Sequence, residues 1–378
     1  MAGGTHIAKS TRWLAALLAT SSFAGPIYNI TGYSMPETVA SSAYALNSAG
    51  QITGTATMPD GSSIAFFANS SGVRQLSPLS GGISSSASGI NASGAVAGTT
   101  YFDSAAQATL WTSAGALGLG TLGGADSYAT AVNDSGVVVG GASTSSGATH
   151  AYLYNGSMRD LGTLADGNWS AAYAVNGSGQ VAGYGDTGGG SFSAFLWTST
   201  GGMTRLGTLG GQSSYAMDIN DRATVAGNAQ TSSGCLHAFV YEDTRMTDLG
   251  TLGGSSSFAY GLNNFGHVVG YSYLSGSDVT HAFLYSGGAM RDLNSLIASD
   301  SGWILTEAYG INDAGQIAGT GLYNGEQRTF LLTPATVGGG ITLGHTLADA
   351  LTTEAPEPGS LSLIVVGAGL ILLASRRN

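Results

Sequence analysis

Three histidines stand in the same short pattern, a His-Ala-aromatic sequence, at His150, His237 and His281. Imidazole is a common metal ligand, so histidines that line one channel could bind a metal ion together. Equivalent residues of different repeats meet only in such a channel. We therefore expect each histidine to make a hydrogen bond at a strand edge, and we predict no metal site.

Carboxylates recur at two further places in the pattern. One set precedes a repeated leucine and is predicted to accept hydrogen bonds from turn amides: Asp160, Asp248 and Asp292. Carboxylates in predicted turns are candidate calcium ligands, among them Asp134, Asp221 and Asp313. One carboxylate per turn falls short of the six to eight oxygens that calcium takes, so calcium-dependent adhesion stays an alternative only.

Two segments depart from the repeat, and each brings a tryptophan and a carboxylate into a predicted loop. Asp166 and Trp169 stand where other repeats have Gly-Gly, and an insertion over residues 298–307 contains Trp303 and Glu307. Aromatic rings beside acids suit the stacking of a carbohydrate, so we predict a ligand site from these four residues. The alternative is that each tryptophan only packs its loop.

A carbohydrate-active enzyme, a glycoside hydrolase or lyase, is the rival interpretation. Its carboxylate pair would be Asp166 and Glu307, which would have to face one cleft at about 5–10 Å. The sequence contains no HExxH, no GxSxG and no Cys/His cluster. The leading interpretation therefore has no catalytic residue and no cofactor.

These residues lie in a unit that recurs along most of the chain. Seven asparagines each begin an Asn-x-x-Gly pattern, with Ala in place of Gly in one copy: Asn47, Asn91, Asn133, Asn176, Asn220, Asn263 and Asn312. Their spacings are 44, 42, 43, 44, 43 and 49 residues, and seven copies of the His-Ala-aromatic pattern, some of them degenerate, keep step. Such a period indicates an array of one supersecondary unit.

One unit reads as four short strands with no helical period. In the fifth unit they are predicted at residues 214–220, 224–228, 236–241 and 246–252, the last containing a repeated Leu-Gly-Thr-Leu-Gly-Gly sequence. Asn-x-x-Gly fits the turn between the first two strands, with Gly at positive φ. Ala223 occupies that Gly position in the fifth unit. The first strand is rich in small residues, so we place it innermost.

A glycine occurs inside every second strand: Gly54, Gly98, Gly140, Gly183, Gly227, Gly270 and Gly319. Glycine within a strand weakens it unless another group approaches closely. We expect an aromatic ring from a neighbouring strand or blade to lie over each of these glycines.

The count of strands favours a closed ring. A fourth-strand sequence without its own unit stands at Tyr28–Tyr33, and the seventh unit lacks one after Phe330. An N-terminal strand that completes the last blade would close the ring and remove exposed sheet edges. We predict an all-β fold, a seven-bladed β-propeller of four-stranded blades over residues 25–333.

The His-Ala-aromatic and Asp-Leu-Gly-Thr-Leu-Gly-Gly patterns over residues 28–333 resemble those of the HAF family of bacterial extracellular repeat proteins. Three units keep the histidine, at His150, His237 and His281, and the others depart from the pattern there. The resemblance implies export and a repeat architecture, and it implies no particular chemistry.

Composition restricts the partners. Charged residues make up 9% of the chain, the formal net charge is −11, and Lys9 is the one lysine. An acidic surface repels phosphate backbones, so we expect no nucleic-acid partner. The single cysteine, Cys235, can form no internal disulfide.

The two ends of the chain look like targeting segments. Residues 1–24 combine Lys9 and Arg12 with an apolar run and small residues before Ala24, as in a signal peptide. Residues 355–378, after a linker at 334–354, resemble a PEP-CTERM sorting tail. Its parts are Pro356, Glu357 and Pro358, an apolar segment at 361–374, and Arg376 and Arg377. As a helix that segment would be about 21 Å long, short of the ~30 Å hydrocarbon core.

The resemblance of the tail implies cleavage by an exosortase-type enzyme and a transient stay in the inner membrane of a Gram-negative bacterium. A plain single-pass anchor is the alternative. Taken together, these features predict a non-enzymatic protein of the cell surface or biofilm matrix that acts in binding or structure. Its expected partners are an extracellular polysaccharide or a surface protein.

Overall fold

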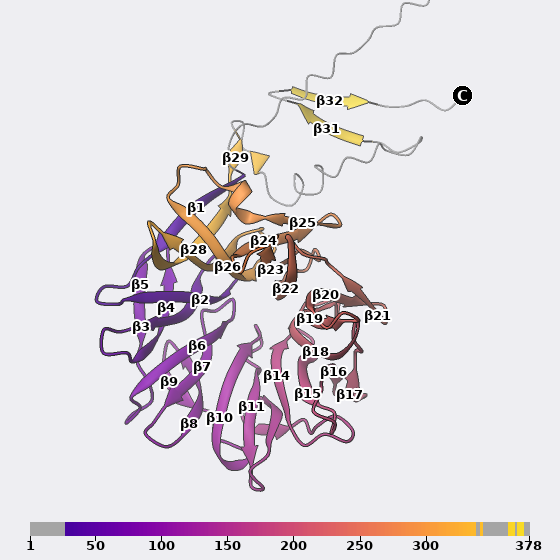
Figure 1. Ribbon diagram of the computed structural model, residues 1–378. Coiled ribbons are helices and arrows are strands. Elements are labelled where there is room, and N and C mark those ends of the chain that lie inside the picture. Colours follow the sequence, from indigo (N-terminus) through magenta and orange to yellow (C-terminus); the bar gives the residue numbers. More distant parts are fainter. Residues whose placement is uncertain (1–26, 338–340, 343–361, 367–368, 374–378) are drawn as a thin grey trace, which may run out of the picture.

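The structure, a computed structural model, describes residues 27–337, 341–342, 362–366 and 369–373. Within residues 27–337 it contains seven four-stranded antiparallel sheets, arranged as blades around a centre (Figure 1). The predicted all-β, seven-bladed propeller is confirmed. The short 3-10 helix η1 (Leu293–Leu296) is the single helix of that range.

Blade one consists of β2 (Ala40–Leu46), β3 (Ile52–Thr57), β4 (Ser63–Asn69) and β5 (Gly72–Leu76). Blade two consists of β6 (Ser84–Ile90), β7 (Val96–Tyr101), β8 (Ala106–Thr112) and β9 (Gly115–Gly118). Blade three consists of β10 (Gly123–Val132), β11 (Val138–Thr144), β12 (Thr149–Tyr154) and β13 (Met158–Asp160). Blade four consists of β14 (Ser170–Val175), β15 (Val181–Asp186), β16 (Phe192–Thr198) and β17 (Gly202–Arg205). Blade five consists of β18 (Gly210–Ile219), β19 (Val225–Thr231), β20 (Leu236–Glu242) and β21 (Arg245–Asp248). Blade six consists of β22 (Gly253–Leu262), β23 (Val268–Leu274), β24 (Thr280–Ser286) and β25 (Ala289–Asp292).

Blade seven is assembled from both ends of the propeller. Its strands are β26 (Trp303–Ile311), β27 (Ile317–Tyr323), β28 (Glu326–Pro334) and, on the outer edge, β1 (Tyr28–Tyr33). β1 pairs antiparallel with β28, with Ile30 opposite Leu332 and Gly32 opposite Phe330. The predicted closure by an N-terminal strand is therefore confirmed, and Figure 1 shows the indigo β1 beside the orange and yellow strands of blade seven.

The first strand of each blade is innermost, as expected. First strands contact the first strands of neighbouring blades around the ring, and β2 contacts both β6 and β26. Small side chains on these strands, such as the fully buried Ala43 and Ala259, allow the blades to converge.

The glycine inside each second strand is required for a different reason from the one expected. In every blade the first strand carries a register irregularity opposite this glycine. A Cβ atom on Gly270 would overlap the carbonyl oxygen of Phe258 on the irregular strand. An aromatic ring also lies close at Gly183 and Gly319, but the general cause is the approach of the neighbouring backbone at a β-bulge.

The seven asparagines do more than shape their own turns. Each side-chain oxygen accepts hydrogen bonds from turn amides, as the Asn-x-x-Gly pattern predicts. Each Nδ2 also donates to the backbone oxygen of the equivalent asparagine in the next blade, at 2.9–3.2 Å. The last bond runs from Asn312 to Asn47 and closes a circular chain, here called the Asn ring.

The Leu-Gly-Thr-Leu-Gly-Gly sequence is a connection and not the fourth strand that we predicted. β21 ends at Asp248, and the segment that follows leads into β22, which starts at Gly253. Asp248 accepts a hydrogen bond from Gly250 N, and Gly250 has φ +73°, so the chain turns directly after the aspartate. The fourth strands are shorter than expected for this reason.

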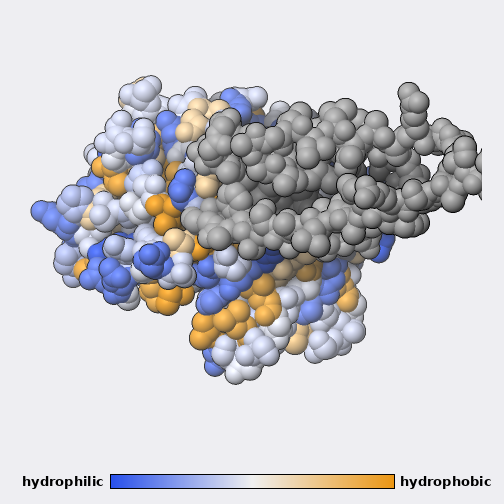
Figure 2. All heavy atoms as spheres, turned by 90° about the horizontal axis from the view of Figure 1, so that it is seen from above, coloured by the Kyte–Doolittle hydropathy of each residue, from blue (hydrophilic) through white to orange (hydrophobic). Residues whose placement is uncertain are grey.

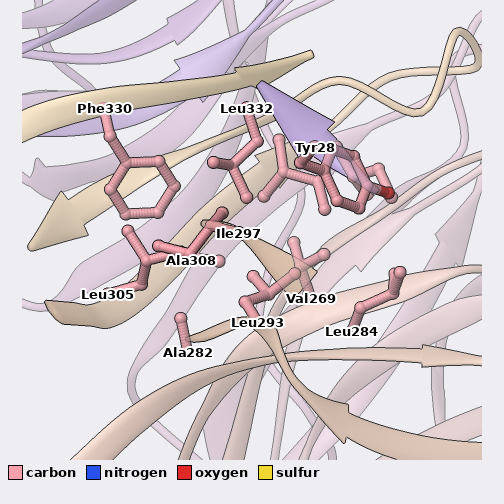
Figure 3. Close-up of a cluster of buried hydrophobic side chains, with 12 residues drawn as sticks. Tyr28, Val269, Ala282, Leu284, Leu293, Ile297, Leu305, Ala308, Phe330 and Leu332 are labelled. Atoms are coloured by element: carbon pink, nitrogen blue, oxygen red, sulfur yellow. The ribbon is translucent and has the colours of Figure 1, made fainter. Parts of the chain in front are cut away.

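The apolar core lies between blades. Each interface between neighbouring blades holds a cluster of buried side chains in the described part of the chain. Figure 3 shows the cluster between blades six and seven, where Tyr28 of β1 lies near Leu332 of β28. The aromatic residue of the His-Ala-aromatic pattern is fully buried in such a cluster, as at Phe239.

Beyond the propeller the structure describes four short strands: β29 (Thr336–Val337), β30 (Ile341–Thr342), β31 (Ser362–Val366) and β32 (Gly369–Leu373). They form two antiparallel pairs. The predicted signal peptide and the sorting residues Pro356, Glu357, Pro358, Arg376 and Arg377 lie outside the described residues. Among the described residues, no helix combines the length and the hydropathy needed to span a membrane.

Candidate functional site

The two faces of the propeller differ in chemistry. The Asn face carries the Asn-x-x-Gly turns and the Asn ring. The opposite face, here called the aromatic face, carries the connections between second and third strands and between successive blades. Both segments that depart from the repeat, around Trp169 and before Trp303, lie on the aromatic face because they lead into first strands.

Large exposed apolar side chains gather on the aromatic face. Within the described part of the chain, six of the nine lie near its strand ends: Val39, Ile83, Tyr101, Val279, Ile304 and Tyr323. Figure 2 shows that exposed apolar side chains (orange) form separate patches among polar ones on the side it presents. Exposed apolar groups that gather on one face often mark a binding surface.

A hollow of about 620 Å³ opens on blade seven, beside the closing strand β1. Its lining includes Tyr33 of β1 and Trp303, Tyr323, Glu326 and Arg328 of the other strands. The rings of Trp303 and Tyr323 lie 5.2 Å apart at an angle of 36°. Arg328 and Glu326 form an ion pair at the same hollow. We call this the Trp303 hollow.

Trp169 is held differently. Its backbone N–H donates to Asp186 at 2.9 Å, and its ring lies 5.4 Å from that of Tyr184 and 5.8 Å from that of Phe192. Tyr184 in turn packs edge-on against Tyr215 of the next blade. Trp169 therefore packs its loop against an aromatic group, which was the alternative reading of this residue.

A second aromatic group lies on the inner wall of blades six, seven and one. It consists of Tyr44, Tyr260, Tyr271, Tyr309 and Glu307, here called the Tyr–Glu cluster. The Tyr309 ring lies 5.3 Å from Tyr44 and 5.0 Å from Tyr260. The Tyr309 hydroxyl donates to Glu307. Burial raises the pKa of Tyr309, and its hydrogen bond to Glu307 raises it further, so this hydroxyl stays protonated.

The inner strands carry negative charge alone. The first and second strands of the seven blades, all within the described range, contain four charged residues: Asp126, Asp186, Asp218 and Glu307. Arginines stand on the outer two strands of the blades or in turns: Arg74, Arg159, Arg205, Arg222, Arg245, Arg291 and Arg328. A group that enters the centre from the aromatic face therefore meets acids without compensating inner-strand cations.

Asp218 stands where other blades have Ala or Gly. Its carboxylate accepts hydrogen bonds from Ile219 N at 2.8 Å and from Leu262 N of the next blade at 2.7 Å. Burial raises the pKa of Asp218 to about 7, although the two hydrogen bonds oppose the shift. Asp218 thus ties blade five to blade six at the inner wall.

The histidines do not converge on one metal ion. Each pairs through Nδ1 with the aspartate of the neighbouring fourth strand: His150 with Asp160 at 2.9 Å, His237 with Asp248 at 2.9 Å and His281 with Asp292 at 2.6 Å. The prediction of a strand-edge hydrogen bond is confirmed. The aspartates also accept turn amides, as expected, for example from Gly162 at 2.7 Å.

The turn carboxylates link blades on the Asn face. Asp134 accepts from Ala92 N, Asp221 from Gly177 N and Asp313 from Asn264 N, all at 2.8–2.9 Å. In the part of the chain that the structure describes, no three His, Cys, Asp or Glu side chains form a group suited to a metal ion. These aspartates have a structural use that the sequence did not indicate.

Of the four predicted site residues, Trp303 lines a hollow and Glu307 belongs to the Tyr–Glu cluster. Trp169 is packed in blade four, and Asp166 is exposed in the connection before it, with φ +71°. Asp166 and Glu307 belong to blades four and seven, which are not neighbours. The structure does not group the four residues into one site.

Sequence reasoning missed the inner-wall tyrosines. Tyr44, Tyr260 and Tyr309 stand at the bulge of their first strands, between two small residues, as in Ala43-Tyr44-Ala45. A comparison of this one position across the seven units would have shown tyrosine in four of them, because Tyr173 is the fourth.

Residues 207–343, less than half of the chain, match a family described as "Protein of unknown function (DUF3466)". No curated protein matches the chain in sequence.

Similar solved structures include TolB from Acinetobacter baumannii, with 13% identity, a TM-score of 0.44 and coverage of 75% of this chain and 63% of that one. A puromycin-hydrolyzing peptidase of Mycobacterium tuberculosis shows 11% identity, a TM-score of 0.49 and coverage of 85% and 56%. The BP39L lectin from Burkholderia pseudomallei shows 11% identity, a TM-score of 0.45 and coverage of 84% and 99%. This chain thus spans less than two thirds of the TolB chain, and similarity at this level carries no functional argument.

Proposed function

We propose that the protein is a non-enzymatic binding propeller that takes a carbohydrate chain in the Trp303 hollow on its aromatic face. The observation that carries the proposal is the composition of this hollow. It combines two tilted aromatic rings, Trp303 and Tyr323, with the Arg328–Glu326 ion pair at a recess of about 620 Å³. Aromatic rings stack on the apolar faces of sugar rings. A carboxylate accepts hydrogen bonds from sugar hydroxyls, and a guanidinium donates hydrogen bonds to them.

The hollow also depends on closure of the ring. Tyr33 and Gly32 come from β1, and the Trp303 ring lies directly over Gly32. Without β1 the recess would lose one wall. Binding would therefore be a property of the closed propeller and not of a single blade.

The test is binding of the full chain to a glycan array, with and without calcium. We expect binding to at least one glycan class that does not change with calcium. Trp303→Ala should abolish it and Tyr323→Ala should weaken it about tenfold or more, a loss of ~1.4 kcal/mol. Trp169→Ala is the matched control, because Trp169 packs in blade four, and it should bind normally.

If Trp303→Ala kept its glycan binding and its melting temperature were unchanged, the proposal would be contradicted. A requirement for calcium would favour the adhesin alternative instead. Hydrolysis of a bound glycan that is lost in Glu307→Gln would favour the enzyme.

We further propose that the protein is exported and sorted to the cell surface or matrix. The signal-like residues 1–24 and the Pro356-Glu357-Pro358 tail support this proposal. In a Gram-negative host with an exosortase-type enzyme, replacement of Pro356, Glu357 and Pro358 by alanine should leave the protein in the membrane fraction. Equal release of both forms would contradict it.

A further inference from the structure

We propose that the Tyr–Glu cluster on the inner wall binds a quaternary ammonium group, with Glu307 as its counter-ion. This site is separate from the Trp303 hollow and takes a ligand of a different class. Its aromatic members are Tyr44, Tyr260, Tyr271 and Tyr309, drawn from blades one, six and seven.

The four rings do not form a single parallel stack, because Tyr309 is inclined to both of its neighbours. Tyr309 meets Tyr44 at 78° and Tyr260 at 56°, with centroids 5.3 and 5.0 Å apart. Tyr271 lies nearly parallel to Tyr260, at 22°. Aromatic faces within about 6 Å attract a cation that has lost part of its water, and quaternary ammonium ligands use such cages.

Charge distinguishes this group from an ordinary aromatic core. The Glu307 carboxylate is half-buried and is fixed by the Tyr309 hydroxyl, which donates to Oε2. Tyr44 is 39% exposed, so the cluster can be reached from solvent.

The surroundings also favour a cation. The inner strands of the described propeller carry acids and no lysine, arginine or histidine, and the whole chain has a formal net charge of −11. A positive ligand is therefore attracted toward the centre over a long range. A quaternary ammonium has no N–H to donate, so the aromatic faces and a single carboxylate are sufficient to satisfy it.

Titration calorimetry of the full chain with choline chloride tests the proposal. The matched neutral probe is 3,3-dimethyl-1-butanol, which has the shape of choline without its charge. We expect choline to bind, and the neutral alcohol to bind about tenfold more weakly or worse. Sodium chloride at equal ionic strength controls for general screening.

Variants separate the roles of ring and charge. Glu307→Gln keeps the size of the side chain and an acceptor for Tyr309, and it should weaken choline binding about tenfold or more. Tyr44→Leu should weaken it similarly, whereas Tyr44→Phe keeps the ring and should leave it nearly unchanged. Thermal melts confirm that each variant is folded.

Equal affinity of choline and the neutral alcohol, or full choline binding by Glu307→Gln, would overturn the proposal. Tighter binding of glucosamine than of choline would also overturn it, because a primary ammonium would then be the preferred group. Trp303→Ala should leave choline binding unchanged, so failure of this inference and failure of the carbohydrate proposal are distinguishable.

Discussion

Ala223 is the one departure from Gly at the fourth position of the Asn-x-x-Gly turns, and it has φ +63°. An L-residue with a Cβ atom is strained in this left-handed region, whereas Gly is not. We predict that Ala223→Gly raises the free energy of unfolding by up to about 1 kcal/mol. Chemical denaturation measures the change.

The reverse substitution at an equivalent turn is the control for this prediction. Gly266 has φ +81° and open space around the position of a Cβ atom. Gly266→Ala should destabilise the protein by about 1 kcal/mol, since strain alone is added. If both variants were neutral, the turn conformation would not limit stability.

Asp218 gives the propeller a pH-dependent stability. Burial raises the pKa of Asp218 to about 7 from 3.8, so the unfolded chain ionises at lower pH than the folded one. The contribution of protonated Asp218 to the free energy of unfolding is fully present below about pH 4 and is lost as pH rises through about 7. We expect a loss on the order of 2 kcal/mol between pH 5 and pH 8, allowing for partial access to water.

Asp218→Asn removes this titration. Its melting temperature should fall less between pH 5 and pH 8 than that of the natural chain. The quantity to compare is the slope of melting temperature against pH. The absolute stability of the variant also changes, because the amide oxygen of Asn can accept only one of the two backbone hydrogen bonds. Identical slopes would show that Asp218 is ionised in the folded protein at both pH values.

At the scale of the strand and turn, the Asn ring joins local geometry to blade packing. Asn133 accepts from Ser135 N and Val137 N and donates to Asn176 O of the next blade at 2.9 Å. Asn133→Ala removes all three bonds. The turn amides of Ser135 and Val137 lose their side-chain acceptor, and the Asn176 carbonyl keeps only the bond from Gly179 N, so the substitution should cost about 2–4 kcal/mol. Denaturant unfolding measures this loss.

Ser135→Ala is the matched control within the same turn. Ser135 is exposed, so its substitution should change stability by less than about 0.5 kcal/mol. A loss from Asn133→Ala no larger than that from Ser135→Ala would mean that the inter-blade bond contributes nothing.

At the scale of the whole molecule, β1 is the strand that closes the circle. Tyr28, Phe330 and Leu332 are buried together in the cluster that Figure 3 shows. Deletion of residues 26–35 removes Tyr28 and exposes Phe330, Leu332 and the edge of β28. It should cost about 4 kcal/mol or more. Thermal unfolding should show a large fall in melting temperature for the entire propeller.

Substitution of the exposed residues of the same strand is the control. Asn29→Ala together with Thr31→Ala leaves the pairing with β28 intact, and the melting temperature should stay nearly unchanged. A deleted chain that melts like the natural one would show that the blades are stable without closure.

Much of the architecture was predictable because the period of the sequence repeat determines the number of blades. The asparagine spacing gave the number of blades. The strand predicted at Tyr28–Tyr33 indicated the closure that its pairing with β28 confirms, although the Leu-Gly-Thr-Leu-Gly-Gly sequence on which that prediction was based is a connection in blade five. Local chemistry was also readable, since an Asn-x-x-Gly turn with Gly at positive φ depends only on neighbours in the chain.

The bulges, the Asn ring and the inner-wall aromatic group were decided by tertiary structure. Asn133 and Asn176 are 43 residues apart and meet only when two blades pack, and Tyr44 meets Tyr309 only when the first blade contacts the last. A sequence determines which side chains each blade carries toward the centre. Which of them touch, and what they can bind, depends on the curvature that closes seven blades into one ring.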